Sequence, residues 1–167
     1  MSEVLYKLKY ARKRDIYPII DLIKHRIDWM DEVGIDQWNK SGYLAKYTYS
    51  YFEDLVDDKL LYVLKDEANV IWGAMTLLEL DARWPGYSDA LFVHNLVTKK
   101  ELKNGGKMLL NYALNEAVTK HKSYIRLDAI VGNDKLNSYY HDLGFEYIDT
   151  VVDGNYKGNL LAKKVIK

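Results

Sequence analysis

The segment from Ala90 to His121 constrains the fold most strongly, because an apolar run passes through a short glycine-containing loop into a helical pattern. The residues from Ala90 to Thr98 are mostly apolar, which is typical of a strand buried on both faces. From Gly106 to His121, apolar residues recur at helical spacing. A buried strand that runs directly into a helix is a unit of sheets covered by helices. This segment therefore predicts a mixed α/β protein.

The other segments predict further strands and helices around that unit. Strand patterns occur at Val4 to Tyr10, Leu60 to Lys65, Val70 to Leu80, Tyr124 to Val131, Phe145 to Val152 and Leu160 to Ile166. Helical patterns occur from Asp15, a candidate N-cap, to Gly34, within the aromatic stretch from Ile35 to about Asp57, and around Leu136 to Leu143. Polar turns at 66–69 and 153–155 predict hairpins. The order β-α-α-β-β-β-α-β-α-β-β predicts one mixed α/β sheet with helices on both faces.

Length and composition exclude several classes of protein. The chain has 167 residues and two prolines, so we expect one domain over residues 1–167. It contains no cysteine, which excludes a disulfide scaffold, a thiolate zinc site and a cysteine nucleophile. Its 24 basic and 24 acidic residues argue against nucleic acid as the partner. No apolar stretch is long enough to span a membrane, so we expect a cytoplasmic protein with no membrane partner.

Two further side-chain groups carry weak signals. A basic run near the N-terminus would favour nucleic acid, but we interpret it as a solvated edge; it consists of Lys7, Lys9, Arg12, Lys13 and Arg14. His25, His121 and His141 show no ligand spacing with one another, so we expect no metal site.

The loop between the buried strand and the helix has the features of an anion site. Residues 98–107 hold four lysines, one glutamate and two adjacent glycines, Gly105 and Gly106. The free N–H groups at a helix N-terminus bind anions, and glycines allow a phosphate to approach the backbone. The loop fits neither nucleotide motif that we tested. A P-loop would need Ser or Thr where Met108 stands, and no register gives the glycine spacing of a dinucleotide fingerprint.

Three segments together resemble the GNAT superfamily of acyl-CoA-dependent N-acetyltransferases, and the resemblance covers essentially the full chain. Leu96-Val97, the loop Glu101 to Gly106, and Leu109-Leu110 fall where this family has its pyrophosphate loop and following helix. Asn133, Tyr140 and Gly144-Phe145 are similar to its pantetheine and thioester segment. Trp29-Met30 and Gly34-Ile35-Asp36-Gln37-Trp38 are similar to the acceptor side of a bacterial subgroup. Glu101 and Asn104 depart from the family pattern, which has Gln or Arg and Gly there.

The resemblance implies a GNAT-like fold with a splayed central strand pair, and acetyl-CoA as cosubstrate. It implies that the coenzyme is bound by Leu96, Val97, Thr98, Leu102, Lys103, Asn104, Gly105, Gly106, Lys107, Asn133 and Tyr140. It implies that the acceptor is bound by Trp29, Gln37 and Trp38. The C-terminal strands could pair across a homodimer.

Acyl transfer to an amine needs a base, a polarised carbonyl and an acid for the departing thiolate. The resemblance places the backbone N–H near Leu96 or Val97 at the carbonyl, and it makes Tyr140 the candidate acid. The alternative for Tyr140 is core packing, because it shares a helix face with other apolar residues. His94 is the candidate base, since imidazole titrates near neutral pH. Glu79, Asp81 and Asp128 are the alternatives to His94.

The sequence is compatible with two functions. The first is transfer of an acetyl group from acetyl-CoA to a small amine by direct attack. The second is a non-catalytic acyl-CoA-binding or interaction module on the same fold, which the irregular Glu101 and Asn104 loop would suit.

Overall fold

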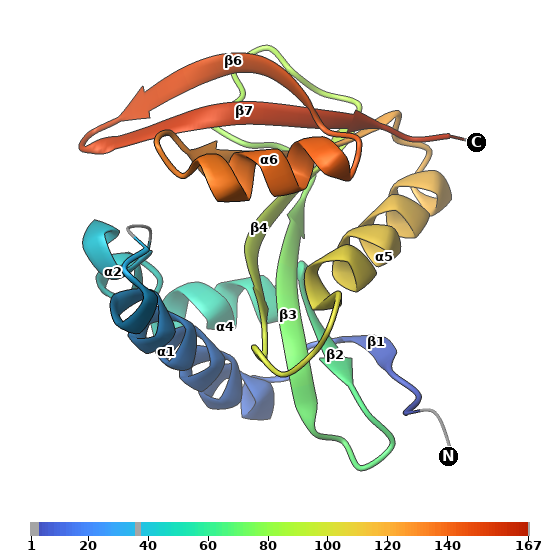
Figure 1. The fold of residues 1–167 in the computed structure, drawn as a ribbon. Helices are drawn as coiled ribbons and strands as arrows, with labels where there is room; N and C mark the ends of the chain where they lie inside the picture. The colour runs from blue at the N-terminus through green and yellow to red at the C-terminus, as the bar shows by residue number, and fades with distance from the viewer. Residues whose placement is uncertain (1–3, 36–37, 167) are drawn as a thin grey trace.

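The computed structural model describes residues 4–35 and 38–166, shown as a ribbon in Figure 1. The strands are β1 (Lys7–Tyr10), β2 (Leu61–Lys65), β3 (Ile71–Leu78), β4 (Ala90–Thr98), β5 (Tyr124–Ile130), β6 (Glu146–Asp153) and β7 (Tyr156–Lys164). The helices are α1 (Ile16–Val33), α2 (Trp38–Ser41), α3 (Tyr43–Lys46), α4 (Tyr49–Asp57), α5 (Gly105–Thr119) and α6 (Asp134–Asp142), and a 3-10 turn η1 (Lys13–Asp15) precedes α1. None of the helices in these described ranges has the length and apolar character that a membrane crossing requires.

The seven strands form one mixed sheet in the order β1-β2-β3-β4-β5-β7-β6. Within the described residues, β4 and β5 are the parallel pair, and the other neighbouring strands are antiparallel. The predicted mixed α/β sheet is therefore confirmed.

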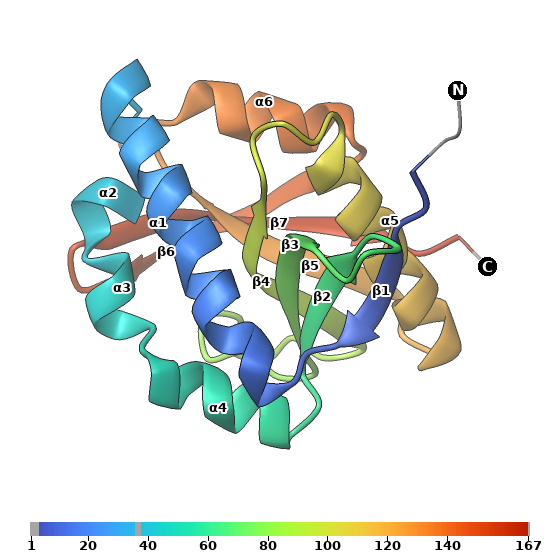
Figure 2. The same cartoon turned by 90° about the horizontal axis from the view of Figure 1, so that it is seen from below.

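Helices cover both faces of the sheet, as Figure 2 shows for α1 and α5 on opposite sides of β2 to β4. Successive residues of β2 supply the two faces, because side chains alternate along a strand. Leu61 and Val63 belong to the core on the side of α1 and α4, whereas Tyr62 and Leu64 belong to the core on the side of α5. The core on the α1 side includes Ile16, Ile19, Ile23, Phe52 and Ala74, and the core on the α5 side includes Met75, Leu91, Leu109, Ala113 and Phe145.

The central pair β4 and β5 separates after three residue pairs. Ala90, Leu91 and Phe92 face Tyr124, Ile125 and Arg126, and no pairing between these two strands follows. Strand β4 continues to Thr98 beside β3, while β5 continues to Ile130 beside β7. The predicted splayed central pair is confirmed, and it leaves one backbone edge of each strand free to bind a ligand.

A β-bulge at Asn95 distorts β4 inside the splayed region. The register against β3 shifts between Ala74 and Thr76, and Asn95 has a φ of 53°. Asparagine tolerates this left-handed conformation better than most residues. Its side chain is fixed on three sides: Oδ1 accepts hydrogen bonds from Tyr51 Oη and Thr76 Oγ1, both at 2.9 Å, and Nδ2 donates to Tyr43 Oη at 2.6 Å. Helices α3 and α4 are thereby tied to the central strand.

The aromatic stretch after α1 differs from the prediction of a loop and one helix. The structure has three short helices, α2, α3 and α4, in this region. Gly42 separates the first two with a φ of 66°, and Thr48 begins α4 by accepting a hydrogen bond from the Tyr51 N–H. Aromatic residues recur throughout the stretch, so their spacing hides these breaks.

Two smaller boundary predictions also change. Strand β7 begins at Tyr156, four residues before the predicted Leu160, because the hairpin pairs as far as Asp153 opposite Tyr156. Asp15 precedes α1 as predicted, but its carboxylate does not cap the helix. Instead it accepts from the Arg12 N–H at 2.8 Å and pairs with Lys65 Nζ at 3.0 Å in a buried ion pair.

Candidate active site

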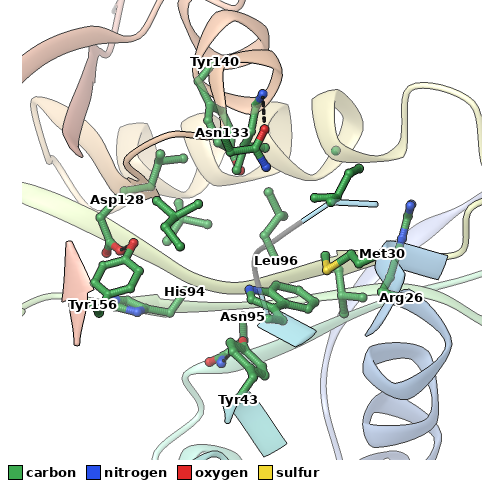
Figure 3. Close-up of a pocket in the computed structure, with 18 of the residues that line it drawn as sticks. Arg26, Met30, Tyr43, His94, Asn95, Leu96, Asp128, Asn133, Tyr140 and Tyr156 are labelled. Atoms are coloured by element: carbon green, nitrogen blue, oxygen red, sulfur yellow. Dashed lines mark hydrogen bonds between the residues drawn. The ribbon is translucent and has the colours of Figure 1, made fainter. Parts of the chain in front are cut away.

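A cleft of about 930 Å³ opens where β4 and β5 separate, and Figure 3 shows its lining. Helix α6 contributes Tyr140, with Asn133 just before the helix, on one side, and β4 contributes His94 and Leu96 on the other. Helices α1 to α3, strand β5 and the hairpin between β6 and β7 complete the walls. The cleft therefore brings together residues that are far apart in sequence.

Tyr140 is both packed and presented to the cleft. The residue is 9% exposed, and its ring meets Phe145 edge-to-face at 5.7 Å. Its hydroxyl makes no hydrogen bond within residues 4–35 and 38–166. Burial raises the pKa of Tyr140, and the neighbouring Tyr139 and Asp128 raise it further, so the phenol keeps its proton at neutral pH. The two predicted roles of Tyr140 are compatible, because the ring packs in the core while the hydroxyl is available to act as an acid.

Asn133 sets the start of α6 and lines the cleft. Its Oδ1 accepts a hydrogen bond from the Leu136 N–H at 3.1 Å, which caps the helix. Asn137 donates from Nδ2 to the backbone oxygens of Ile130 at 3.0 Å and Asn133 at 2.8 Å, so α6 is fixed to the end of β5. The position of Tyr140 follows from this anchor.

His94 is hydrogen-bonded to a carboxylate. His94 Nε2 lies 2.5 Å from Asp81 Oδ2, and the two side chains are 14% and 7% exposed. Burial raises the pKa of Asp81, but the hydrogen bond and the charge of His94 outweigh burial and hold it below its ordinary value. Asp81 is therefore ionised at neutral pH. Glu79, the third alternative base, does not line the cleft; it pairs with Lys122 at 3.4 Å.

Asp128 on β5 has a different set of partners. Its Oδ2 accepts from Arg83 Nη1 at 3.1 Å and from the hydroxyl of Tyr156 at 2.5 Å. Burial and the Asp128 carboxylate raise the pKa of Tyr156. Gly158 makes this placement possible, because a Cβ there would lie 2.5 Å from the Tyr156 ring. Gly158 precedes Leu160, where the predicted strand began, so the sequence pattern did not indicate this close approach.

Asp81, His94 and Asp128 lie within 4.8 Å of one another and could share a metal ion. However, His94 Nε2 and Asp81 are bonded to each other, and Arg83 places a guanidinium against Asp128. Each of the three side chains is therefore already used in a hydrogen bond within the described residues.

The predicted pyrophosphate loop joins β4 to the N-terminus of α5. Asn104 adopts the left-handed conformation with a φ of 58°, and α5 begins one residue earlier than predicted, at Gly105. Leu96, Val97, Thr98 and Gly106 line the cleft. Leu102 packs partly into the core and Gly105 is buried, whereas Lys103 and Asn104 on the loop and Lys107 in the first turn of α5 are exposed. Glu101 is also exposed.

Arg26 on α1 lines the same end of the cleft and was missed by the sequence interpretation. Its Nε donates to the Thr98 backbone oxygen at 2.8 Å, and its Nη2 donates to Thr98 Oγ1 at 3.1 Å. Burial lowers the pKa of Arg26, and the charge of Glu101 opposes this shift. Arg26 therefore places a cation at the Thr98 end of the cleft, near enough to Glu101 for the two charges to interact. Arg26 follows Lys24 and His25 in the helical pattern, and this polar run gave no signal for a place in the cleft.

The side of the cleft that the resemblance assigns to the acceptor is aromatic. Trp29 and Trp38 line it as predicted, and Trp38 stacks on Tyr43 with ring centroids 4.4 Å apart. Gln37 lies outside the described residues. At the mouth, Asp153 lies 4.0 Å from Lys46 and 3.3 Å from Arg83, so charged groups surround the aromatic wall.

Gly105 and Gly106 provide a matched pair for testing the junction between β4 and α5. A Cβ at Gly105 would lie 2.9 Å from Thr98 Cγ2 and 3.0 Å from Leu102 Cδ2, whereas at Gly106 its close contact is Tyr139 Oη at 2.8 Å, with the next atom 3.7 Å away. Replacement of glycine by alanine raises the helix propensity by the same amount at both positions. We therefore expect Gly105→Ala to have a free energy of unfolding about 1–3 kcal/mol lower than Gly106→Ala, measured by urea denaturation. Equal stability of the two variants would show that the junction is not tightly packed.

The sequence matches no family model. The uncharacterized N-acetyltransferase YesJ of Bacillus subtilis (strain 168) is 22% identical over 149 residues, which cover 84% of this chain and 81% of that protein. A GNAT-family acetyltransferase from Listeria monocytogenes has a TM-score of 0.78 at 21% identity, covering 95% of this chain and 94% of its own. The PaiA N-acetyltransferase from Thermoplasma acidophilum, solved in complex with coenzyme A, has a TM-score of 0.75 at 18% identity, covering 96% of this chain and 99% of its own.

The chain has the GNAT fold. This finding confirms the fold that the resemblance predicted, and the sequence similarity to YesJ confirms the resemblance itself. In the GNAT fold of this chain, the splayed strands, Tyr140 and His94 face a single cleft.

Proposed function

We propose that this protein is an N-acetyltransferase that moves an acetyl group from acetyl-CoA to the amine of a small molecule by direct attack. The observation that carries the proposal is the cleft between β4 and β5, which is lined by the candidate base His94 and the candidate acid Tyr140. Similarity to YesJ and to the structure of PaiA with coenzyme A supports catalysis over the non-catalytic module.

The residues of the cleft fit the chemistry of coenzyme A. The unpaired edge of β4 after Phe92 offers backbone hydrogen-bonding groups to the amides of pantetheine. The N-terminus of α5 directs backbone N–H groups at the pyrophosphate, and Gly106 lines the cleft at that point. Arg26, Lys103 and Lys107 add positive charge, and Asn133 offers its amide to the pantetheine arm. When bound, acetyl-CoA supplies the acetyl group as an activated thioester.

The chain's own residues then have three roles. His94 accepts a proton from the attacking amine. A backbone N–H near Leu96 or Val97 stabilises the negative charge on the thioester oxygen without reorganising, because the strand already fixes its direction. Tyr140 donates its proton to the sulfur as the thiolate leaves. The aromatic wall formed by Trp29, Trp38 and Tyr43 holds the acceptor.

The finer parts of the proposal concern partners and location. The acceptor is a small amine, and neither nucleic acid nor a membrane is needed for the reaction. A cytoplasmic location and a homodimer through the C-terminal strands remain predictions. Strand β6 is one of the two edge strands of the sheet in the described residues, and an edge position is the geometry that such pairing requires.

The proposal is tested by thiol release. We expect the purified protein to release CoA from acetyl-CoA only when an amine is added, in a screen of polyamines, arylalkylamines, amino acids and aminoglycosides. Titration calorimetry with acetyl-CoA is run in parallel. Binding without release across the whole panel would favour the non-catalytic module, and no heat at millimolar acetyl-CoA would contradict both functions.

A further inference from the structure

Asp128 lines the cleft, whereas Asp81 lies beside it against His94, and the two carboxylates have different partners. Asp128 is paired with the guanidinium of Arg83 and accepts the hydroxyl proton of Tyr156. Asp81 is 93% buried at its side chain, and within the described residues it forms no ion pair with Lys or Arg. Its oxygens are used by His94 at Oδ2 and by the Arg83 backbone N–H at Oδ1, 2.9 Å away. The negative charge of Asp81 is therefore directed at the imidazole.

The loop between β3 and β4 holds Asp81 rigidly in this position. The Asp81 backbone oxygen accepts from the Trp84 N–H at 3.0 Å. Trp84 is 1% exposed, contacts Phe92 with ring centroids 5.9 Å apart, and has the guanidinium carbon of Arg126 5.3 Å from its ring centre. Because the loop is anchored in the core, the backbone that carries Asp81 is held beside His94. A buried carboxylate that is fixed in this way is costly unless it has a hydrogen-bond donor.

The contact determines which ring nitrogen of His94 carries the proton. An ionised carboxylate can only accept, so neutral His94 must donate from Nε2. The lone pair is then on Nδ1, which is the atom left to act as a base. When His94 takes a second proton, the imidazolium is stabilised by the adjacent carboxylate.

We infer that Asp81 is a positioning residue for acetyl transfer: it holds the proton of His94 on Nε2, leaves Nδ1 to receive the amine proton, and stabilises the imidazolium. The inference rests on the proposed function. In the step, the amine nitrogen forms a bond to the acetyl carbon and loses its proton to His94 Nδ1. The carbon–sulfur bond breaks, its electron pair leaves with sulfur, and Tyr140 supplies the proton. Solvent then returns a proton to Tyr140 and takes one from His94, so no oxidant or reductant is needed.

Other charged or titratable groups of this part of the cleft come from four elements. They are Asp128 on β5, Arg83 on the β3–β4 loop, Tyr156 on β7 and Asp153 at the end of β6. Arg83 contacts both Asp128 and Asp153, and Tyr156 keeps its proton because its pKa is raised. Asp81 is thus the carboxylate of this group that has no arginine partner. Its removal should therefore change the protonation of His94 more than removal of Asp128 or Asp153 would.

The first test reads the tautomer by ¹⁵N NMR of the full chain without any substrate. His94 signals are assigned by their loss in His94→Gln. We expect wild-type His94 to carry its proton on Nε2, and Asp81→Asn to populate the Nδ1–H form, because an amide can donate to Nε2. Glu79→Gln removes a carboxylate two residues away that faces Lys122, and should leave the signals unchanged. An Nδ1–H tautomer in the wild type, or the same tautomer in Asp81→Asn, would overturn the inference.

The second test uses kinetics with an accepted amine. We expect Asp81→Asn to lower kcat by roughly 10²-fold with little change in KM for acetyl-CoA, and Glu79→Gln to change neither. The acidic limb of the pH–rate profile should move to lower pH in Asp81→Asn, because the imidazolium has lost its carboxylate. Asp81→Glu should restore part of the rate, and it serves as the second variant if Asp81→Asn does not fold. If Asp81→Asn lowers kcat but leaves the acidic limb of the pH–rate profile unchanged, Asp81 has a structural role only. If wild type accepts no amine, the proposed function fails, while the NMR result still decides the role of Asp81 toward His94.

Discussion

Tyr140→Phe is expected to lower kcat by roughly 10²-fold while leaving CoA affinity and the melting temperature nearly unchanged. The substitution removes one hydroxyl and keeps the ring that packs on Phe145. Because that hydroxyl has no hydrogen-bond partner within the described ranges, its loss removes no internal contact. Because the pKa of Tyr140 is raised, the phenol stays protonated, and we expect no basic limb from Tyr140 in the pH–rate profile between pH 7 and 9.

Tyr112→Phe is the matched control for this prediction. Tyr112 lies on α5 and donates to the Tyr6 backbone oxygen at 3.3 Å, away from the cleft. Its variant should lose about 0.5–1.5 kcal/mol of unfolding free energy while activity per folded molecule is retained. The acid role of Tyr140 would be wrong if Tyr140→Phe showed the Tyr112→Phe pattern of lost stability and retained activity.

His94→Gln is expected to lower kcat/KM by roughly 10²-fold or more and to flatten the acidic limb of the pH–rate profile. An amide can replace the hydrogen bond to Asp81 but does not titrate near neutral pH. The profile of kcat/KM should be measured from pH 5 to 9 at saturating acetyl-CoA.

His25→Gln controls for the loss of one histidine, because His25 is exposed on α1 and does not line the cleft. It should leave both the rate and the limb unchanged. A retained acidic limb in His94→Gln would contradict the base role and would move it to Asp128, which lines the cleft, or to Asp81, which contacts His94. Glu79 is not a candidate in that case, because it is paired with Lys122 and contacts neither the cleft nor His94.

Periodicity predicted the strands and the longer helices because each buries one continuous apolar face. Ile16, Ile19 and Ile23 recur along α1, and Leu110, Ala113 and Ala117 recur along α5, and all of these residues are buried. The separation of β4 from β5 has no signature in periodicity; the resemblance implied it, and the three-residue pairing confirms it. The bulge at Asn95 could not be predicted, because one polar residue in an apolar strand does not reveal a positive φ.

The side chains of the cleft were only partly predictable. Tyr140, Asn133 and His94 were identified from their resemblance to a family or from their chemistry, and all three line the cleft. The pairing of His94 with Asp81 depends on the loop anchored by Trp84, and the pairing of Asp128 with Arg83 joins two elements far apart in sequence. Such contacts are set by tertiary packing, which sequence spacing does not encode.

The destination of the acetyl group tests the central claim most directly. The protein is incubated with acetyl-CoA that carries ¹³C in the acetyl group, together with an amine identified by thiol release, and the products are analysed by mass spectrometry. Direct transfer predicts that the amine gains one labelled acetyl group for each CoA released, and that Tyr140→Phe slows both products equally. Label recovered only as free acetate, with the amine unmodified, would contradict the assignment as an N-acetyltransferase.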